Sequence, residues 1–276
     1  MKNSIFNILF LIMLYLSSSV YAQQDVLKVG VVPQFDARRI QSIWQPIIED
    51  LTRVSNLHIK FVGSKNIPEF EKQLLRGDFD IAYMNPYHLI KANESIGYHP
   101  ILRDTEKMLG GIIVVHKDSG IREANQLAGH TVAFPAPNAL GASLLPRAEL
   151  GEKYGISFKA KYVNSHSSVY LNVAMRLVDA GGGVLKTLKK QPQNIQDSLK
   201  VIHRSEKVSP HPIAVHPRLS AQVVKKIRES FIQLSNKTRG KSLLSQIPIK
   251  NIGVANLAEY QSLSGMGLDK YYQKKD

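Results

Sequence analysis

The first part of the chain alternates between short apolar runs and segments whose apolar residues follow helical spacing. Residues 27–32, 59–62 and 80–84 are apolar-rich runs of strand length. Residues 67–74 have helical spacing, and a longer buried helix face is predicted by Ile40, Ile43, Trp44, Ile47, Ile48 and Leu51. Strand and helix therefore alternate, which predicts an α/β fold built on a doubly wound, mostly parallel sheet.

The same alternation returns in the second part of the chain, which favours a second lobe. Apolar runs at 111–116, 131–134 and 158–163 predict strands, and residues 167–177 have the spacing of a helix. The segment 210–215 is expected to carry the chain back to the first lobe. We therefore expect the first lobe to comprise residues 23–111 and 209–276, the latter with C-terminal helices, and the second lobe to comprise residues 112–208.

One detail suggests that the two lobes share an architecture. A strand ending at Pro33 is followed, after a helix, by Asp80 at the start of another strand. Pro135 and Asp179 stand in the same relation in the second part of the chain. Because α/β chains contain many βαβ units, chance similarity stays open as the alternative to a repeat.

The first 22 residues have the features of a signal peptide. Lys2 is the only charge, an apolar run covers residues 5–16, and Val20 and Ala22 are small residues at the positions that signal peptidase requires. We expect cleavage after Ala22 and a periplasmic location. A retained membrane anchor is the alternative, but the run is short for a span of about 20 residues, and no cysteine follows it for a lipid anchor.

Composition narrows the chemistry. The chain has no cysteine, which excludes disulfides, thiolate metal sites and a cysteine nucleophile. Its formal net charge is +14, but the basic residues are scattered, and the densest group, Lys186, Lys189 and Lys190, has no interleaved aromatic residues. We interpret the charge as solvated surface with a positive field that helps to attract anions, and we expect no nucleic-acid partner.

Ligands of open α/β sheets bind beyond the carboxyl ends of the strands. Four such segments, residues 33–39, 85–87, 135–143 and 181–184, would converge on one cleft between two facing lobes. The third has two prolines followed by small residues that open a helix, and unpaired amides at a helix start can bind an anion without a basic side chain. Asn138 in this segment is either part of that site or an ordinary helix N-cap.

Several segments resemble a known family. Residues 77–82, 137–138, 144–146, 164–166 and 210–213 look like matching motifs of the phosphate, phosphite and phosphonate binding proteins of ABC transporters, in the same order along most of the chain. The resemblance implies a type 2 periplasmic binding fold, in which two lobes joined by two crossing strands close over a ligand. It further implies a small anionic ligand, an ABC permease as partner, contact with the membrane only through that partner, and a monomer.

The chain departs from this family at the ligand site. Well-known members carry a Ser-Thr-Ser run at the helix start, where this sequence has Ala139, Leu140 and Gly141, so that the amides remain but the hydroxyls are lost. Members that bind aminophosphonates hold the amine with carboxylates, whereas the matching regions here offer Lys186 and His211. We therefore expect phosphate, a phosphonate, a related oxyanion or a small carboxylate rather than an aminophosphonate.

His166 is the strongest single candidate, because it begins a helix and matches the family's ligand-facing histidine. It would donate a hydrogen bond to the anion, unless it only caps the helix or lies at the surface. Tyr87 would contact the ligand from the other lobe, unless it is a core tyrosine. A solvated surface role is the favoured interpretation of Arg38 and Arg39, and an approach of one of them to the cleft is the alternative. The full set of expected ligand-binding residues is Gln34, Asn85, Tyr87, Asn138, Ala139, Leu140, Gly141, Ser143, His166, Ser167, Ser168, Gly182 and His211.

No catalytic or metal-binding pattern competes with a binding role. The sequence has no G-x-S-x-G elbow and no H-E-x-x-H motif, and no carboxylate lies near His211 and His216. We expect no cofactor, no metal and no catalysis. The favoured function is a periplasmic solute-binding protein for an ABC importer. The alternatives are a sensory binding protein that partners a membrane histidine kinase or cyclase, and an enzyme on the same fold.

Overall fold

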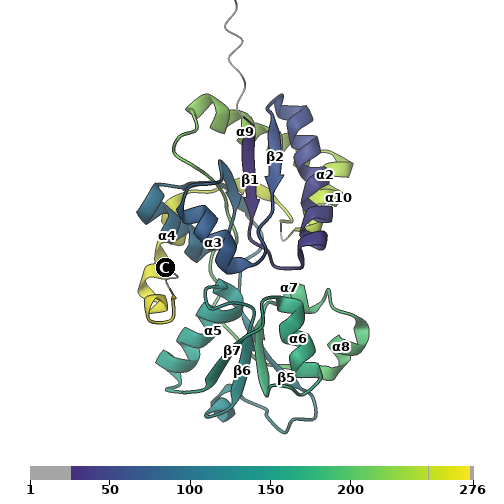
Figure 1. Cartoon of the computed structure of the whole chain (residues 1–276), viewed down its shortest axis with the longest axis vertical. Helices are drawn as coiled ribbons and strands as arrows, with labels where there is room; N and C mark the ends of the chain where they lie inside the picture. Colours follow the sequence, from purple (N-terminus) through teal and green to yellow (C-terminus); the bar gives the residue numbers. More distant parts are fainter. Residues whose placement is uncertain (1–25, 248, 274–276) are drawn as a thin grey trace, which may run out of the picture.

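Two β-sheets, one above the other in Figure 1, organise the chain into an upper first lobe and a lower second lobe. The computed structural model describes residues 26–247 and 249–273, so the expected signal peptide lies outside the described residues. The six-stranded sheet of the first lobe has the order β11-β4-β10-β3-β1-β2. Its strands are β1 (Leu27–Val31), β2 (Ile59–Val62), β3 (Ile81–Tyr83), β4 (His99–Asp104), β10 (Ile213–Val215) and β11 (Ile252–Val254).

The second lobe has a five-stranded sheet with the order β7-β6-β8-β5-β9. These strands are β5 (Ile112–His116), β6 (Thr131–Phe134), β7 (Lys159–Tyr162), β8 (Ala180–Gly183) and β9 (Leu199–Arg204). Two connections join the sheets, from β4 to β5 and from β9 to β10, and they pair where Leu109 and Val208 exchange backbone hydrogen bonds of 2.9 and 2.8 Å. The lobes are thus joined by two crossing segments, as expected.

The prediction of mostly parallel sheets is confirmed by strand direction, although both sheets are mixed: β10 and β11 in the first sheet and β5 in the second run opposite to the other strands. The adjacent parallel pairs are β1–β2 and β1–β3 in the first sheet and β6–β7 and β6–β8 in the second. The reason is topological: β10 and β5 each enter their sheet from the connection between the lobes and run away from it. They are therefore antiparallel to β3 and β8, whose carboxyl ends face that connection.

The predicted structural repeat is confirmed by matching strand orders and by a matching pair of aspartates. Asp80 accepts a hydrogen bond of 2.8 Å from the backbone N–H of Lys28, and its own N–H donates to the carbonyl of Lys28. Asp179 makes the same two bonds with Thr131, at 2.8 and 3.1 Å. The aspartate before β3 thus anchors the start of β1, and the aspartate before β8 anchors the start of β6 in the same way.

Helices cover the sheets of both lobes. In the first lobe, α2 (Ala37–Ser55), α9 (Ala221–Ser235) and α10 (Thr238–Gln246) pack together, and α3 (Ile67–Leu75) packs on α4 (Pro86–Ile96). None of the helices within the described ranges is both long and apolar enough to cross a membrane. The helical segments of the second lobe and the C-terminus are η1 (Ala124–Leu127), η2 (Leu140–Leu144), α5 (Leu145–Ala148), η3 (Glu149–Lys153), α6 (His166–Ala174), α7 (Leu185–Leu188), α8 (Gln193–Ser198), η4 (Leu257–Gly265) and η5 (Leu268–Lys270).

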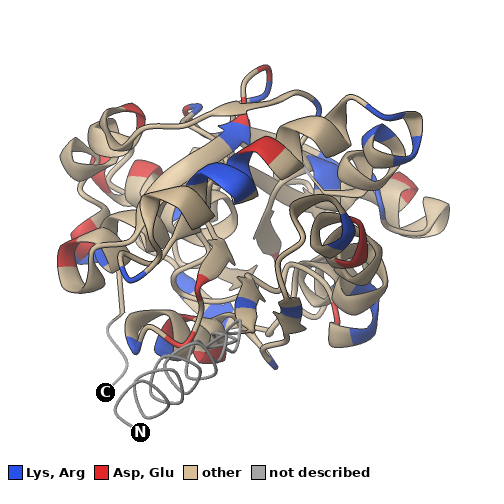
Figure 2. Cartoon of the chain, turned by 90° about the horizontal axis from the view of Figure 1, so that it is seen from above, with Lys and Arg blue, Asp and Glu red and all other residues tan. Residues whose placement is uncertain are grey.

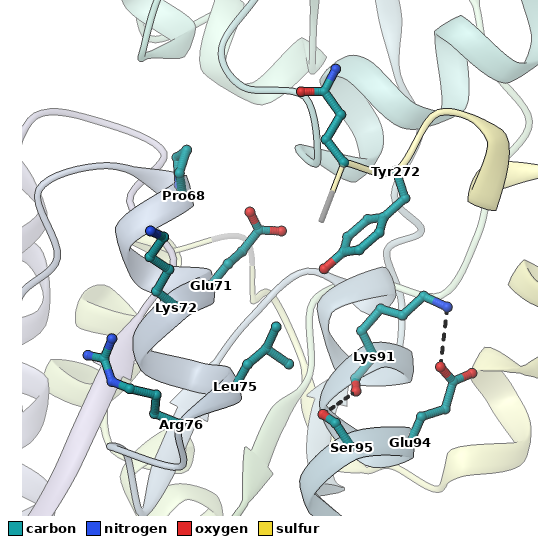
Figure 3. A pocket seen from close by; sticks show the side chains of 10 residues that line it. Pro68, Glu71, Lys72, Leu75, Arg76, Lys91, Glu94, Ser95 and Tyr272 are labelled. Atoms are coloured by element: carbon teal, nitrogen blue, oxygen red, sulfur yellow. Dashed lines mark hydrogen bonds and ion pairs between the residues drawn. The ribbon is translucent and has the colours of Figure 1, made fainter. Parts of the chain in front are cut away.

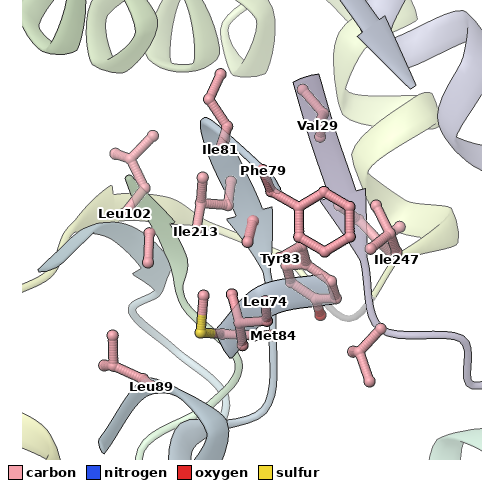
Figure 4. Close-up of a cluster of buried hydrophobic side chains, with 14 of the residues drawn as sticks. Val29, Leu74, Phe79, Ile81, Tyr83, Met84, Leu89, Leu102, Ile213 and Ile247 are labelled. Carbon is pink, nitrogen blue, oxygen red and sulfur yellow. The ribbon is translucent and has the colours of Figure 1, made fainter. Parts of the chain in front are cut away.

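The core of the first lobe lies where the sheet meets these helices. Figure 4 shows Val29, Ile81 and Tyr83 from neighbouring strands gathered with Phe79 and Leu74. The predicted inner face of α2 is buried throughout, from Ile40 to Leu51. Each fully buried aliphatic or aromatic side chain contributes about 1.5–3 kcal/mol. These contacts fix the strand ends that reach the space between the lobes.

Candidate functional site

Residues from both lobes and from both connections enclose a cavity between the two sheets. Its volume is about 20 Å³, which is room for about one water molecule. Seven of the expected site residues line it together: Gln34, Asn85, Ala139, Leu140, Gly141, His166 and His211. These seven residues therefore lie together between the lobes, as predicted from the sequence.

The helix that begins at Leu140 presents unpaired amides beside this cavity. Ser143 and Leu144 both donate their backbone N–H to the carbonyl of Ala139, at 2.7 and 3.2 Å, which makes the first turn wide. Among the described residues, no acceptor pairs with the backbone N–H of Leu140, Gly141 or Ala142. Three consecutive donors at a helix start, at the wall of a buried cavity, form a site suited to an anion.

The two histidines of the cavity are neutral at pH 7. His166 is buried at the start of α6, and burial lowers its pKa to about 4. His211 is buried against Tyr83, and burial lowers its pKa to about 3, with smaller contributions from His88 and His166. Gln34 Nε2 lies 3.1 Å from His211 Nε2, so with Gln34 donating, His211 carries its proton on Nδ1. Each ring then offers one N–H donor and no charge.

These pKa values make stability fall in mild acid. Because the folded-state pKa of His166 is below its unfolded value, its contribution to stability is complete above pH 6.5 and is lost as pH falls toward 4. At pH 5 the unfolding free energy should be lower by about 2 kcal/mol through His166 alone. Urea unfolding of wild type and His166→Gln at pH 7.5 and 5 measures this, and an equal loss in both proteins would contradict it.

Asn85 and Asn138 connect the lobes beside the cavity. Asn85 caps α4 by accepting from the N–H of His88 at 2.8 Å, and its Nδ2 donates to the Asn138 carbonyl at 3.1 Å. Asn138 Nδ2 donates to Glu71 Oε2 at 3.1 Å and to the Gln273 carbonyl at 2.8 Å, and Oδ1 accepts from Gln273 N–H. Asn138 is therefore not a helix N-cap. Its side chain ties the second lobe to α3 and to the C-terminal segment.

Tyr87 and Ser143 lie off the cavity wall. Tyr87 donates its hydroxyl to Asp269 Oδ1 at 2.6 Å and meets the ring of Tyr272 edge-on, so it belongs to the packing of the C-terminal segment on α4. This is the core role that stood as the alternative to ligand contact. Ser143 is fully buried, and its hydroxyl has no hydrogen-bond partner among the described residues.

The remaining expected residues also lie outside the cavity lining. Ser168 Oγ pairs with Ser165 Oγ at 2.8 Å in the N-terminal turn of α6, and Ser167 is half-buried on the same turn. Gly182 allows a close approach, but within its own lobe: a Cβ there would lie 2.1 Å from the Ala142 carbonyl oxygen. Gly182 thus determines how closely η2 packs on β8.

Sequence reasoning missed the apolar part of the cavity wall. Val184 lies in the expected segment 181–184 but was not among the expected ligand-binding residues, and Val32 directly follows β1, where the strand-end rule could have identified it. Ile67 and Leu109 come from a helix start and from a connection, where no local pattern marks them. Together with Ala142, these four residues make up the apolar part of the wall. The polar groups left for a ligand are the backbone amides, the two imidazoles, and the side chains of Gln34 and Asn85.

A wider hollow lies outside the space between the lobes. It has a volume of about 630 Å³ and lies between α3 and α4, with Glu71 and Tyr272 side by side at its inner end (Figure 3). None of the thirteen expected ligand residues lines it. Its lining is Pro68, Glu71, Lys72, Leu75, Arg76, Lys91, Glu94, Ser95, Tyr272 and Gln273.

Comparisons with known proteins agree with this architecture. The phosphate-import protein PhnD of Mycolicibacterium smegmatis is 21% identical over 233 residues, which cover 77% of this chain and 73% of the relative. A binding-protein component of a phosphonate ABC transporter from Pseudomonas aeruginosa has 18% identity and a TM-score of 0.79, over 90% of this chain and 87% of that one. PhnD1 of Prochlorococcus marinus, solved with methylphosphonate, has 16% identity and a TM-score of 0.81, over 90% and 99%.

The family model described as "ABC transporter, phosphonate, periplasmic substrate-binding protein" matches residues 29–260, which include every residue that lines the interlobe cavity. The two-lobed mixed α/β fold of this chain is that of the two solved structures. The chain therefore belongs to the family of periplasmic substrate-binding proteins of phosphonate ABC transporters.

Proposed function

We propose that this protein captures a small phosphoryl anion, phosphate or a phosphonate, between its lobes and delivers it to an ABC permease. The observation that carries the proposal is the row of unpaired amides at Leu140, Gly141 and Ala142 beside the interlobe cavity. Hydrogen bonds from amides to an anion are about twice as strong as neutral ones, and a partly dry site strengthens them further. The named ligands of two relatives, phosphate and methylphosphonate, support the same class.

Ligand entry requires the lobes to separate. A cavity of about 20 Å³ holds about one water molecule, which is less than a phosphoryl group with its oxygens. The two connections that pair at Leu109 and Val208 are the only backbone links between the sheets within the described residues, so they are the natural hinge. In our proposal the anion binds the helix start first, and closure then brings Gln34 and His211 from the first lobe onto it.

The organisation expected from the sequence fits this proposal. Residues 112–208 would form the second lobe, and residues 23–111 and 209–276 the first, which is supported by the position of every strand of the two sheets. Export after cleavage at Ala22 is supported by the periplasmic description of the family. We propose a monomer that meets the membrane only through its permease.

The proposal predicts that His166 matters more for affinity than Arg39. His166 lines the cavity, whereas the Arg39 guanidinium stacks on Phe35 at 4.2 Å. His166→Ala should weaken binding about tenfold, the equivalent of one hydrogen bond of about 1.4 kcal/mol, and Arg39→Ala by less than about threefold. Calorimetric titration of the two variants with methylphosphonate measures both effects. The reverse order would show that the ligand lies against α2 instead.

A ligand panel tests the proposed function itself. Purified, refolded protein should show a rise in melting temperature with phosphate or a phosphonate, because a ligand that binds only the folded state stabilises it. Mass spectrometry of small molecules that copurify with the protein should find a phosphoryl compound. No thermal shift across oxyanions and small carboxylates would contradict the proposal. Turnover of a bound compound would favour an enzyme, and a kinase gene in place of a permease gene beside this one would favour a sensor.

A further inference from the structure

A wide basic pocket adjoins the interlobe cavity on the side of the two connections. Its volume is about 680 Å³, within the range of small-molecule sites. Both connections contribute to it, together with α7 and the loop after β1. Four residues, Gln34, Leu109, Val184 and His211, line both the pocket and the cavity, so the two spaces share a wall.

Five lysines line this pocket without acidic partners. They are Lys107, Lys186, Lys189, Lys190 and Lys207, and none of them has an ion pair among the described residues. The one carboxylate in the lining, Glu106, pairs with Lys250, which lies outside it. Figure 2 shows basic and acidic residues interspersed over most elements in view. The pocket therefore gathers five basic side chains around one carboxylate that is already paired.

Two of these ammonium groups are held in place from the opposite lobe. Lys186 Nζ donates to the Ile247 carbonyl at 2.6 Å and the Ser245 carbonyl at 3.3 Å, and Lys190 Nζ donates to the Gln246 carbonyl at 2.9 Å. These carbonyls end α10, where a helix favours cations. An ammonium has three donors, so Lys190 keeps two for a ligand and Lys186 keeps one.

The clustering of these charges is unfavourable without an anion. Burial lowers the pKa of Lys186 to about 8, and the like charges of Lys190 and Lys107 add to the effect. A negative group in the pocket would relieve this repulsion. An amine would meet the same repulsion, and the carboxylate of the lining, Glu106, is already paired with Lys250.

We propose that the ligand carries a second anionic group, a carboxylate or another phosphoryl group, which lies among these lysines while its first phosphoryl group binds the amides of residues 140–142. This inference rests on the proposed function and narrows its substrate class. The shared wall at Val184 and His211 places the two anion sites next to each other, so one small molecule can occupy both when the lobes close.

Calorimetric titration with three phosphonates tests the inference. Methylphosphonate has only the phosphoryl group, phosphonoacetate adds a carboxylate, and 2-aminoethylphosphonate adds an amine. We expect phosphonoacetate to bind at least about tenfold more tightly than methylphosphonate, and the amine to bind more weakly than either. Equal affinity for methylphosphonate and phosphonoacetate would overturn the second anion site and leave the proposed function standing. No binding of any of the three, or of inorganic phosphate titrated alongside them, would overturn both.

Two double variants test whether the pocket causes the tighter binding of phosphonoacetate than of methylphosphonate. Lys107→Gln with Lys207→Gln removes two exposed lysines of the lining that make no side-chain hydrogen bond in the described structure, and should reduce the preference to less than about threefold while the affinity for methylphosphonate stays unchanged. Lys60→Gln with Lys200→Gln changes the net charge equally, at exposed positions outside the pocket, and should keep the full preference. Equal effects of the two double variants would overturn the assignment.

Discussion

Asn138→Asp should drive the lobes apart. Asn138 is buried and donates to Glu71 Oε2 across the boundary between the lobes, and Glu71 is itself buried, with Oε1 3.0 Å from His88 Nε2. The substitution keeps the shape of the side chain but removes both donated hydrogen bonds and places a carboxylate against a carboxylate. Leaving a buried charge uncompensated costs about 3–5 kcal/mol, and separation of the lobes relieves that cost.

The expected result is an increased radius of gyration in small-angle X-ray scattering without ligand, together with weaker binding of methylphosphonate. Each lobe keeps its own sheet, so the circular dichroism spectrum should be unchanged. Glu71→Gln in the Asn138→Asp background supplies the matched control, because an amide at position 71 can donate to the new carboxylate. The double variant should recover about half of the lost affinity for methylphosphonate. Recovery stays incomplete because the hydrogen bond to the Gln273 carbonyl is still missing. A compact Asn138→Asp protein with normal affinity would refute the role of this contact.

Gly182→Val should destabilise the second lobe by about 3 kcal/mol or more. A Cβ at Gly182 would lie 2.1 Å from the Ala142 carbonyl oxygen and 2.5 Å from the Phe134 ring. The Ala142 carbonyl oxygen is a backbone atom of η2, so no side-chain rotation can relieve the clash. The helix start that carries the unpaired amides must therefore move away from β8. Overpacking of this kind costs 1–3 kcal/mol in ordinary cores, and a clash with backbone costs more.

Urea unfolding measures the loss of stability. Calorimetric titration with methylphosphonate measures the loss of affinity that displacement of the backbone amides should cause. Gly265→Val is the control, because a Cβ at Gly265 meets no atom within 4 Å and the residue is exposed. It should change stability by less than about 0.5 kcal/mol. If Gly182→Val unfolded like the control and bound ligand normally, close packing of η2 on β8 would not position the site.

Local patterns in the sequence predicted most elements and the place of the site, because the physical causes are local. Helical spacing identified the buried face of α2 from Ile40 to Leu51, which residues within one or two turns determine. The strand-end rule brought Gln34 and Asn85 to one cavity, since parallel strands of one sheet end at the same edge, whereas His166 was expected from the family resemblance. Asp80 and Asp179 marked the structural repeat.

The tertiary structure alone decided the roles that depend on distant partners. Asn138 meets Gln273, 135 residues away, and Tyr87 meets Asp269, 182 residues away, so neither role is visible in neighbouring residues. The mixed sheets follow from where β5 and β10 enter, and the basic pocket forms only because both connections and α7 meet. Elements and candidate loops could be predicted because they depend on contacts between residues that are close along the chain. The folded chain decided which side chains face the ligand, because that depends on long-range packing between the lobes.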